Sequence, residues 1–193
     1  MTNDEALALF RDAGALLTGH FELSSGRHSG EYLEKFRLVE NPRLLEPMCR
    51  DLAERFAGAG ARYVLGPTTA GIILAYRVAD YLHIEGRYAE KEGGERKLRR
   101  GQSLPEGSKV LVVDDILTTG GAVRECTDLV ARHGAELVGV GVLGDRSGGK
   151  VRFDAPLEAV LTVDVVSYAP EDCPLCRAGV PIDHPGTSAT RTR

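Results

Sequence analysis

The chain has 193 residues, a length that suits one domain or one domain with a small appendage. Its composition, 42% hydrophobic and 27% charged, is ordinary for a soluble globular protein. The net charge of −4 argues against a general nucleic-acid binder, which would usually be basic. No apolar run has the length of a membrane span, and charged residues interrupt the segment where a signal peptide would need an apolar stretch. Four cysteines in a chain of this length do not form a disulfide framework, so we expect a protein of the reducing cytoplasm.

The N-terminal segment has the pattern of a capped helix followed by a polar stretch. Thr2 and Glu5 have the spacing of a capping box, and apolar residues recur at helical intervals as far as Leu17. We expect Gly19 to end this helix. Residues 20–32 are polar and rich in Gly and Ser around two apolar positions, which predicts a short strand or hairpin.

A helix, a strand and a second helix follow. Asn41 and Pro42 predict a helix start, because a capping side chain precedes a proline at the first helical position. Residues 62–66 predict a strand and residues 72–82 the next helix. The turn between them, 66–71, consists of small residues, and the N-terminus of the helix after it can bind an anion. A plain connecting turn has the same composition.

Residues 87–91 predict an edge strand, and residues 92–102 predict a mobile surface loop. The loop holds two adjacent glycines, many basic side chains and almost no apolar residue. A solvated run of charges is the ordinary explanation of such a stretch. A basic flap would also close over a strongly anionic ligand and exclude water from it.

The most informative stretch is 109–123. Val110–Val113 predicts a buried strand of a parallel sheet, and Asp114 and Asp115 follow it. Two threonines and two glycines come next, and then a helix with its apolar face on Val123, Cys126, Leu129 and Val130. Glycines allow a close backbone approach, and the first N–H groups of the helix stabilise a phosphate. The aspartates suit ribose hydroxyls or a divalent cation, so the stretch predicts a site for a ribose 5-phosphate.

This stretch resembles the phosphoribosyl pyrophosphate (PRPP) signature of the type I phosphoribosyltransferases. A second motif, Gly-x-Phe-x-Leu-x-Ser-Gly-Arg from Gly19 to Arg27, resembles the N-terminal hood of the orotate phosphoribosyltransferases. The resemblance covers about residues 19–146 and implies an α/β fold, with a central mostly parallel sheet flanked by helices and a small N-terminal hood. It implies a helix and hood over 1–40, a core over 41–170 with a mobile loop at 90–102, and a C-terminal segment over 171–193.

The resemblance also implies a reaction: transfer of the phosphoribosyl group of PRPP to orotate, with Mg²⁺ bound mainly through PRPP and water rather than directly by side chains. It implies a homodimer in which loop 90–102 completes the neighbouring site, and a cis or strained peptide at Thr68–Thr69. The implied PRPP-binding residues are Asp114, Asp115, Ile116, Leu117, Thr118, Thr119, Gly120, Gly121, Ala122, Thr68, Thr69, Ala70, Gly71, Lys91, Arg99 and Arg100. The implied orotate-binding residues are Thr118, Arg146 and Ser24, and the candidate catalytic lysines are Lys91 and Lys97.

The sequence departs from the family pattern at several positions. Ser24 and Ala70 stand where the family often has lysine, and Leu33 and Glu34 stand where aromatic residues are common. These differences weaken the assignment of the base more than that of PRPP. A purine or xanthine phosphoribosyltransferase and a non-enzymatic PRPP-sensing transcription regulator therefore remain alternatives. The hood motif and Arg146 favour orotate, and no basic face or added DNA-binding segment is evident.

The C-terminal part predicts one more strand, around 159–163 at the sheet edge, and then a Cys-x-x-Cys pair at Cys173 and Cys176. Such a pair can provide half of a zinc site. The remaining ligands would have to be Asp183 and His184, or come from a second chain. The five histidines show no regular metal spacing, so we predict no histidine cluster. We expect Cys49 and Cys126 in the core and a disordered tail over 184–193.

Overall fold

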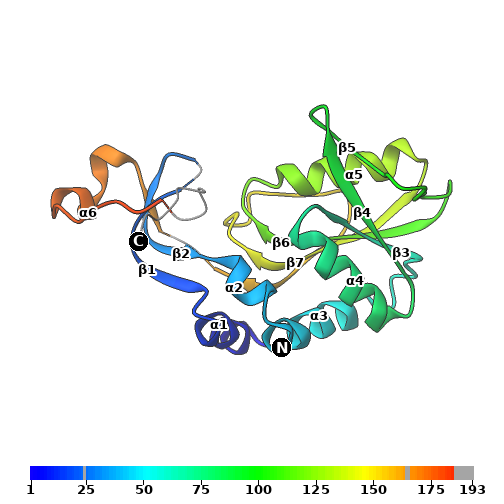
Figure 1. Cartoon of the computed structure of the whole chain (residues 1–193), viewed down its shortest axis with the longest axis horizontal. Coiled ribbons are helices and arrows are strands. Elements are labelled where there is room, and N and C mark those ends of the chain that lie inside the picture. Colours follow the sequence, from blue (N-terminus) through cyan, green and yellow to red (C-terminus); the bar gives the residue numbers. More distant parts are fainter. Residues whose placement is uncertain (24, 164–165, 185–193) are drawn as a thin grey trace.

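The computed structural model describes residues 1–23, 25–163 and 166–184, and it consists of a six-stranded sheet with helices on both faces and a smaller three-stranded sheet beside it (Figure 1). The larger sheet has the order β5-β4-β3-β6-β7-β8, and its pairings are parallel except at the edge strand β5. The predicted α/β fold with a mostly parallel sheet is confirmed. None of the helices in the described ranges has both the length and the apolar character that crossing a membrane requires.

The elements of the large sheet and its helices are α3 (Pro42–Phe56), β3 (Tyr63–Pro67), α4 (Ala70–Leu82), β4 (Glu85–Glu92), β5 (Glu95–Lys97), β6 (Lys109–Leu117), α5 (Gly121–Arg132), β7 (Glu136–Asp145) and β8 (Leu157–Thr162). The remaining elements are α1 (Asn3–Asp12), β1 (Leu16–Glu22), β2 (His28–Leu33), α2 (Lys35–Val39), β9 (Ser167–Tyr168), a 3-10 turn (Pro170–Asp172) and α6 (Pro174–Arg177).

Two apolar layers cover the two faces of the large sheet. Along β6, Leu111 and Val113 pack with α3 and α4, whereas Val110 and Val112 pack with α5. This alternation follows from the two-residue period of a strand. Because both faces are covered, the whole apolar run of β6 is buried, as the sequence predicted.

The strand order places a topological switch between β3 and β6. The chain runs from β3 through α4 to β4 on one side, and from β6 through α5 to β7 on the other. The two helices therefore cover opposite faces, while their N-termini meet the same edge of the sheet, where the parallel strands end. Ligands of open α/β sheets bind at such an edge.

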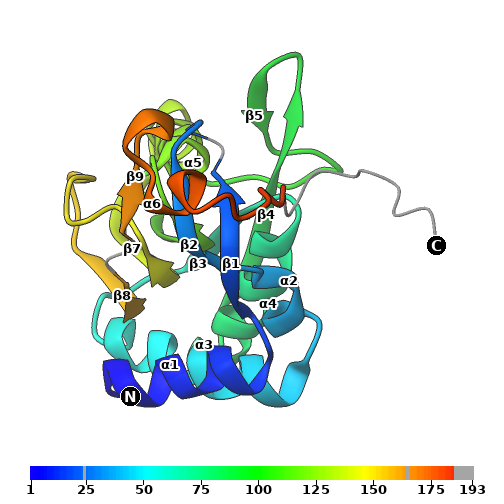
Figure 2. The same cartoon turned by 90° about the vertical axis from the view of Figure 1, so that its left-hand side faces the viewer.

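The small sheet, which we call the hood sheet, has the order β1-β2-β9 and combines the two ends of the chain (Figure 2). β1 and β2 form the antiparallel hairpin that residues 20–32 predicted, and β9 pairs with β2. Asp183 forms an isolated bridge with Phe21 of β1. The hood sheet therefore includes C-terminal residues that the N-terminal motif did not reveal.

The first helix ends earlier than predicted. The capping box at Thr2 and Glu5 is present, but α1 stops at Asp12 instead of Gly19, and Leu16 and Leu17 belong to β1. Gly14 has a φ of +61°, and the N–H of Ala15 donates to the carbonyl of Phe10 over 2.8 Å, so the chain turns at Gly14.

The predicted edge strand and the loop after it also differ from the structure. β4 is an interior strand, and residues Glu95–Lys97 add the strand β5 at the edge. The predicted mobile surface loop across 92–102 therefore contains a strand at these residues, and its mobility stays a prediction. The turn between β4 and β5 is Gly93-Gly94, and both residues have positive φ, as a two-residue hairpin turn of type I′ requires.

Candidate functional site

The acidic pair lies inside the central strand rather than after it. β6 continues through Leu117, with Asp114 paired in register with Val142 of β7. Asp114 is 8% exposed and Asp115 is 3% exposed. Oδ1 of Asp114 accepts a hydrogen bond of 2.9 Å from the N–H of Asp115. Two carboxylates are therefore held rigidly by backbone pairing at the end of a buried strand.

Lys35, at the start of α2, is the cationic partner of this pair. Its Nζ donates to Oδ1 of Asp115 over 3.0 Å and lies 2.8 Å from Oδ2. Sequence reasoning missed Lys35 because the contact joins two segments that are far apart along the chain. The lysine compensates one of the two buried charges and leaves Asp114 without a lysine of its own.

Burial raises the pKa of Asp114 to about 7, and the negative charge of Asp115 acts in the same direction. The hydrogen bond from the N–H of Asp115 and the charges of Lys35 and Arg96 oppose this rise. Desolvation dominates because a carboxylate loses more than the protonated acid does when water is removed. Asp114 therefore changes its charge near neutral pH.

The turn after β6 has the geometry of an anion site. Gly120 caps α5 with a φ of +78°, and a Cβ there would lie 2.8 Å from Cγ1 of Val151. Only glycine suits that position. The first N–H groups of α5 have no intrahelical acceptor, and the hydroxyls of Thr118 and Thr119 are on exposed residues beside them. This turn presents several donors to one point at the positive end of a helix.

The turn after β3 is built in a similar way at the neighbouring strand. The Thr68–Thr69 peptide is cis, as predicted. A Cβ on Gly66 would lie 2.0 Å from the carbonyl oxygen of Gly71, so the two ends of this turn are in direct backbone contact. The side chain of Thr69, the N-cap residue of α4, makes no capping hydrogen bond. The first N–H groups of α4, which point out of the end of the helix, therefore have no side-chain acceptor there.

Arg96 links the turn after β3 to helix α5 and was missed by sequence reasoning. It is 7% exposed, and its Nη1 donates to Oγ1 of Thr68 over 3.2 Å and to the carbonyl of Ala89 over 3.1 Å. Its Nε lies 3.0 Å from Oε2 of Glu125 on α5, without hydrogen-bond alignment. The Gly93-Gly94 dipeptide was the available signal, because a hairpin turn there places Arg96 opposite Lys91.

The four predicted basic candidates do not converge on the Asp114–Ala122 segment. The β4–β5 hairpin projects from the large sheet (Figures 1 and 2), and its cations pair with acids of the same hairpin or of α5. The pairs are Lys91 with Glu125 (3.0 Å), Lys97 with Glu92 (3.4 Å), Arg99 with Glu92, and Arg100 with Glu90 (3.2 Å).

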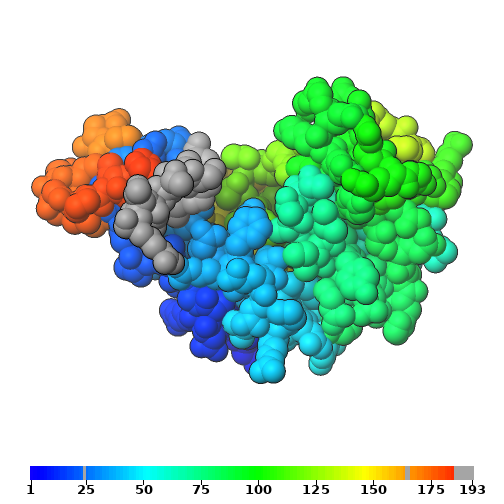
Figure 3. All heavy atoms as spheres, viewed as in Figure 1, coloured from blue at the N-terminus to red at the C-terminus, as the bar shows by residue number. Residues whose placement is uncertain are grey.

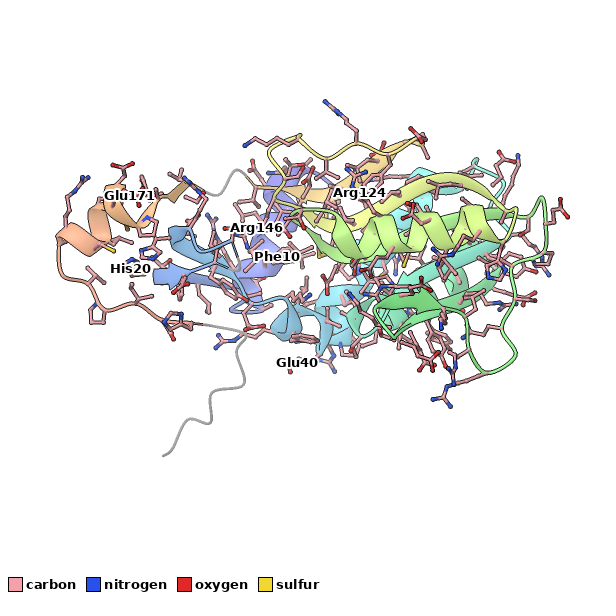
Figure 4. The ribbon with its side chains drawn as sticks, turned by 90° about the horizontal axis from the view of Figure 1, so that it is seen from above. Phe10, His20, Glu40, Arg124, Arg146 and Glu171 are labelled. Carbon is pink, nitrogen blue, oxygen red and sulfur yellow. The ribbon has the colours of Figure 1, made fainter. Side chains whose placement is uncertain are left out.

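Arg146 follows β7 and lies where the hood sheet meets the core (Figure 4). Its backbone N–H donates to the carbonyl of Leu117 over 2.8 Å, which fixes it beside the turn after β6. Its Nε and Oγ of Ser147 are buried without a partner among the described residues. Burial lowers the pKa of the Arg146 guanidinium, and Tyr32 and Glu31 of the hood sheet partly offset this. The site thus holds donors that lack an acceptor.

The surface is hollowed between the hood sheet and the core (Figure 3). Both helix N-termini and Arg146 belong to the core side of this region, and β2 belongs to the other. Thr118 is exposed at the turn, as a residue near a bound base would have to be. Ser24, the remaining predicted orotate contact, lies outside the described residues.

Comparison with known proteins gives a consistent result. A family model described as "Phosphoribosyl transferase domain" matches residues 43–174. Orotate phosphoribosyltransferase from Pelotomaculum thermopropionicum is 50% identical over 187 residues, which are 97% of this chain and 98% of the relative. The protein of the same name from Thermotoga maritima is 45% identical over 179 residues, covering 93% of this chain and 96% of the relative.

Solved structures agree with this result. Orotate phosphoribosyltransferase from Aeropyrum pernix is 29% identical, with a TM-score of 0.67, and the match covers 82% of this chain and 93% of that one. Adenine phosphoribosyltransferase from Rhodothermus marinus has a TM-score of 0.64 at 23% identity, covering 83% of this chain and 100% of that one, which shows a shared fold alone. From the sequence relatives and the family model together, the chain belongs to the phosphoribosyl transferase domain family and, within it, to the orotate phosphoribosyltransferases.

Proposed function

We propose that the protein transfers the phosphoribosyl group of PRPP to N1 of orotate, giving orotidine 5′-monophosphate and pyrophosphate, a step of pyrimidine biosynthesis. The observation that carries the proposal is the meeting of two helix N-termini beside a buried acidic pair, at the switch point between β3 and β6. A substrate with two anionic ends and a hydroxylated ring between them matches this arrangement of charge.

Each part of PRPP has a complementary part of the site. The backbone N–H groups of Ile116–Ala122 would hold the 5′-phosphate, and Asp114 and Asp115 would accept hydrogen bonds from the ribose hydroxyls. The turn Thr68–Gly71 would hold the pyrophosphate at the N-terminus of α4. The reaction inverts C1′ through an oxocarbenium-like transition state, so positioning and charge stabilisation supply the rate.

Mg²⁺ fits this site as a partner of the substrate. The turn Thr68–Gly71 offers backbone groups and hydroxyls but no carboxylate, and Mg²⁺ commonly binds through phosphate oxygens and retained waters. When bound, the ion would neutralise charge that develops on the departing pyrophosphate. The side chains of Asp114 and Asp115 would then remain available for the ribose hydroxyls.

Arg146 supports orotate as the base. A guanidinium presents a planar fork that matches a carboxylate, and orotate carries one whereas adenine, guanine and xanthine do not. The buried Nε of Arg146 has no partner among the described residues. A carboxylate bound there would accept a hydrogen bond from a donor that folding has already removed from water.

We also propose a homodimer in which residues 90–102 complete the site of the neighbouring subunit. The hairpin projects from the sheet, and its basic side chains pair with local acids rather than with the turn at Thr118–Ala122. Exchange of those acids for the oxygens of pyrophosphate would bring Lys91, Lys97, Arg99 and Arg100 to the substrate. Four free cysteines are consistent with a protein that acts in the cytoplasm.

The first experiment tests the reaction itself. Purified protein with PRPP and Mg²⁺ should consume orotate, followed by its ultraviolet absorbance, and should leave adenine, guanine, uracil and xanthine unchanged. Omission of PRPP, or removal of Mg²⁺ with EDTA, should stop the reaction, and added Mg²⁺ should restore it. Turnover of a purine in place of orotate would overturn the proposed base.

A substitution at Arg146 tests the base site separately from the PRPP site. We expect Arg146→Ala to raise the KM for orotate by about 10- to 100-fold, with little change in the KM for PRPP. This factor corresponds to the loss of one charge-assisted hydrogen bond, which contributes about 1.5–3 kcal/mol to binding. The matched control is Arg152→Ala, an exposed arginine a few residues later in the chain. Equal effects on both KM values would place Arg146 outside the base site.

The raised pKa of Asp114 predicts a pH-dependent stability. The folded carboxyl keeps its proton up to about pH 7, whereas the unfolded one loses it near its ordinary value of 3.8. Between these values the folded state binds more protons, so the wild-type free energy of unfolding falls as pH rises. Asp114→Asn removes this term and should therefore gain stability relative to wild type between pH 5 and pH 8.5, while losing affinity for PRPP.

Urea unfolding of wild type and Asp114→Asn at pH 5 and pH 8.5 measures this difference, and isothermal titration measures PRPP binding. Asp128→Asn, an exposed carboxylate on α5, is the control and should show no such change between the two pH values. The same wild-type-to-Asn difference at both pH values would contradict the assigned pKa.

Mixed dimers test the contribution of the neighbouring loop. Co-expression of Asp115→Asn with the double variant Lys91→Ala/Lys97→Ala should restore about a quarter of wild-type activity, because about half of the dimers are mixed and each mixed dimer has one intact site. The control pair, Asp115→Asn with Arg146→Ala, places both changes in the core site, so neither site of its mixed dimers is intact and it should restore no activity. Mixed dimers of the first pair that form but restore no activity would show that the loop serves its own subunit.

A further inference from the structure

Two histidines and two cysteines meet at the end of the hood sheet that lies away from Arg146 (Figure 4). His20 is on β1, His28 on β2, and Cys173 and Cys176 are at the start and inside of α6. Their ligand atoms all lie within 4.8 Å of one another. This corrects two expectations, because two of the five histidines do group together, and the side chains that meet the Cys-x-x-Cys pair are not those of Asp183 and His184.

The residues first expected as ligands have other places. The backbone of Asp183 bridges to Phe21, and its carboxylate accepts from the N–H of His184. Nδ1 of His184 lies 3.4 Å from Oε2 of Glu22. Sequence spacing could not identify His20 and His28, because hairpin pairing and the return of the C-terminal segment bring them to the cysteines.

The distances within the cluster are those of a tetrahedron around one metal ion. Nε2 of His20 lies 3.1 Å from Nδ1 of His28, 3.5 Å from Sγ of Cys173 and 3.7 Å from Sγ of Cys176. Nδ1 of His28 lies 3.2 Å from Sγ of Cys176. Zinc bonds of about 2.0–2.1 Å to nitrogen and about 2.3 Å to sulfur place neighbouring ligand atoms about 3.3–3.8 Å apart in a tetrahedron. These four distances lie within tenths of an ångström of those values, and the two other distances among the ligand atoms do not exceed 4.8 Å.

A second contact orients the first histidine for metal binding. Nδ1 of His20 lies 2.7 Å from the carbonyl oxygen of Val180, which can only accept a hydrogen bond. Nδ1 therefore carries the proton, and Nε2 presents its lone pair to the cluster. Metal-bound histidines commonly donate their other N–H to a carbonyl or carboxylate in this way.

Burial of the cluster favours a bound cation. Cys173 is 0% exposed, and His20 and His28 are 2% and 5% exposed, while Cys176 is partly exposed. Both cysteines are free. Two imidazoles and two thiols packed against one another are poor hydrogen-bond partners, and a cation bound to all four resolves this.

We propose that His20, His28, Cys173 and Cys176 bind one Zn²⁺ ion that fastens the C-terminal segment to the hood sheet. Two nitrogen and two sulfur ligands in a tetrahedron select zinc, and four protein ligands leave no open position for catalysis. The site is structural, because Figure 4 places His20 at the far end of the hood sheet from Arg146.

The small size of the hood sheet explains why a metal would be needed there. A two-stranded hairpin is marginal in water, and β9 and α6 add only two and four residues. Zinc would join β1, β2 and α6 at one point. Arg27, which donates to Oγ and to the carbonyl oxygen of Ser167, ties β9 to the same hairpin. The ion would thereby hold the hood in position over the base site.

Metal analysis of the purified full-length protein tests the proposal without reference to activity. After dialysis against metal-free buffer, inductively coupled plasma mass spectrometry should find about one zinc per chain. Cys176→Ser and His28→Ala should each lose most of it. The controls Cys49→Ala and His133→Ala, which change a cysteine and a histidine elsewhere in the fold, should retain it. Zinc retained in the cluster variants, or absent from wild type even after added Zn²⁺, would overturn the proposal.

Cobalt substitution reports on the ligand set. Protein refilled with Co²⁺ should show the visible bands of a tetrahedral site and a near-ultraviolet sulfur-to-cobalt band, which Cys176→Ser should weaken by about half because one of two thiolates is removed. Far-ultraviolet circular dichroism checks that each variant retains the core fold. A visible spectrum of octahedral Co²⁺, or no sulfur band in folded wild type, would exclude this site.

Discussion

The structure depends on one constraint. Two neighbouring parallel strands end at the same edge of the sheet, and the chain continues from them onto opposite faces. β3 leads into α4 on one face, and β6 leads into α5 on the other. Two helix ends with partial positive charge are thereby fixed close together. The order of the strands, rather than any single side chain, creates a place for a ligand with two anionic groups. Arg96 then braces the turn after β3 against α5, so the two ends keep their separation.

Between these helix ends the protein violates an ordinary rule of folding, because it buries two adjacent carboxylates in a strand. Lys35 compensates Asp115, whereas Asp114 retains a pKa raised to about 7. Such a pair lowers the stability of the free protein, since the charged form is desolvated. Sites of this kind are where local structural preference and function disagree. The apolar residues of β6 and the pairing with β7 hold the carboxylates in place despite this cost.

The sequence predicted the elements whose signals are local and missed the contacts that only the fold creates. The apolar run of β6, the helix cap at Asn41 and the need for Gly120 were readable, because each depends on neighbouring residues. The end of α1 was misplaced because the apolar pattern continues from the helix into β1. Arg96 was read as part of a loop because its burial comes from α5 and the turn at Thr68, which are distant in sequence.

The contact between Gly66 and Gly71 has a consequence for how this enzyme can vary. A methyl group on either residue would meet backbone or ring atoms of the other end of the turn, at 2.0 Å from one side and 2.6 Å from the other. A flexible side chain could swing away from such a clash, but backbone cannot. Neither position can therefore gain a side chain on its own. A change in this turn would therefore have to replace the whole segment at once, since neither glycine can be substituted by itself.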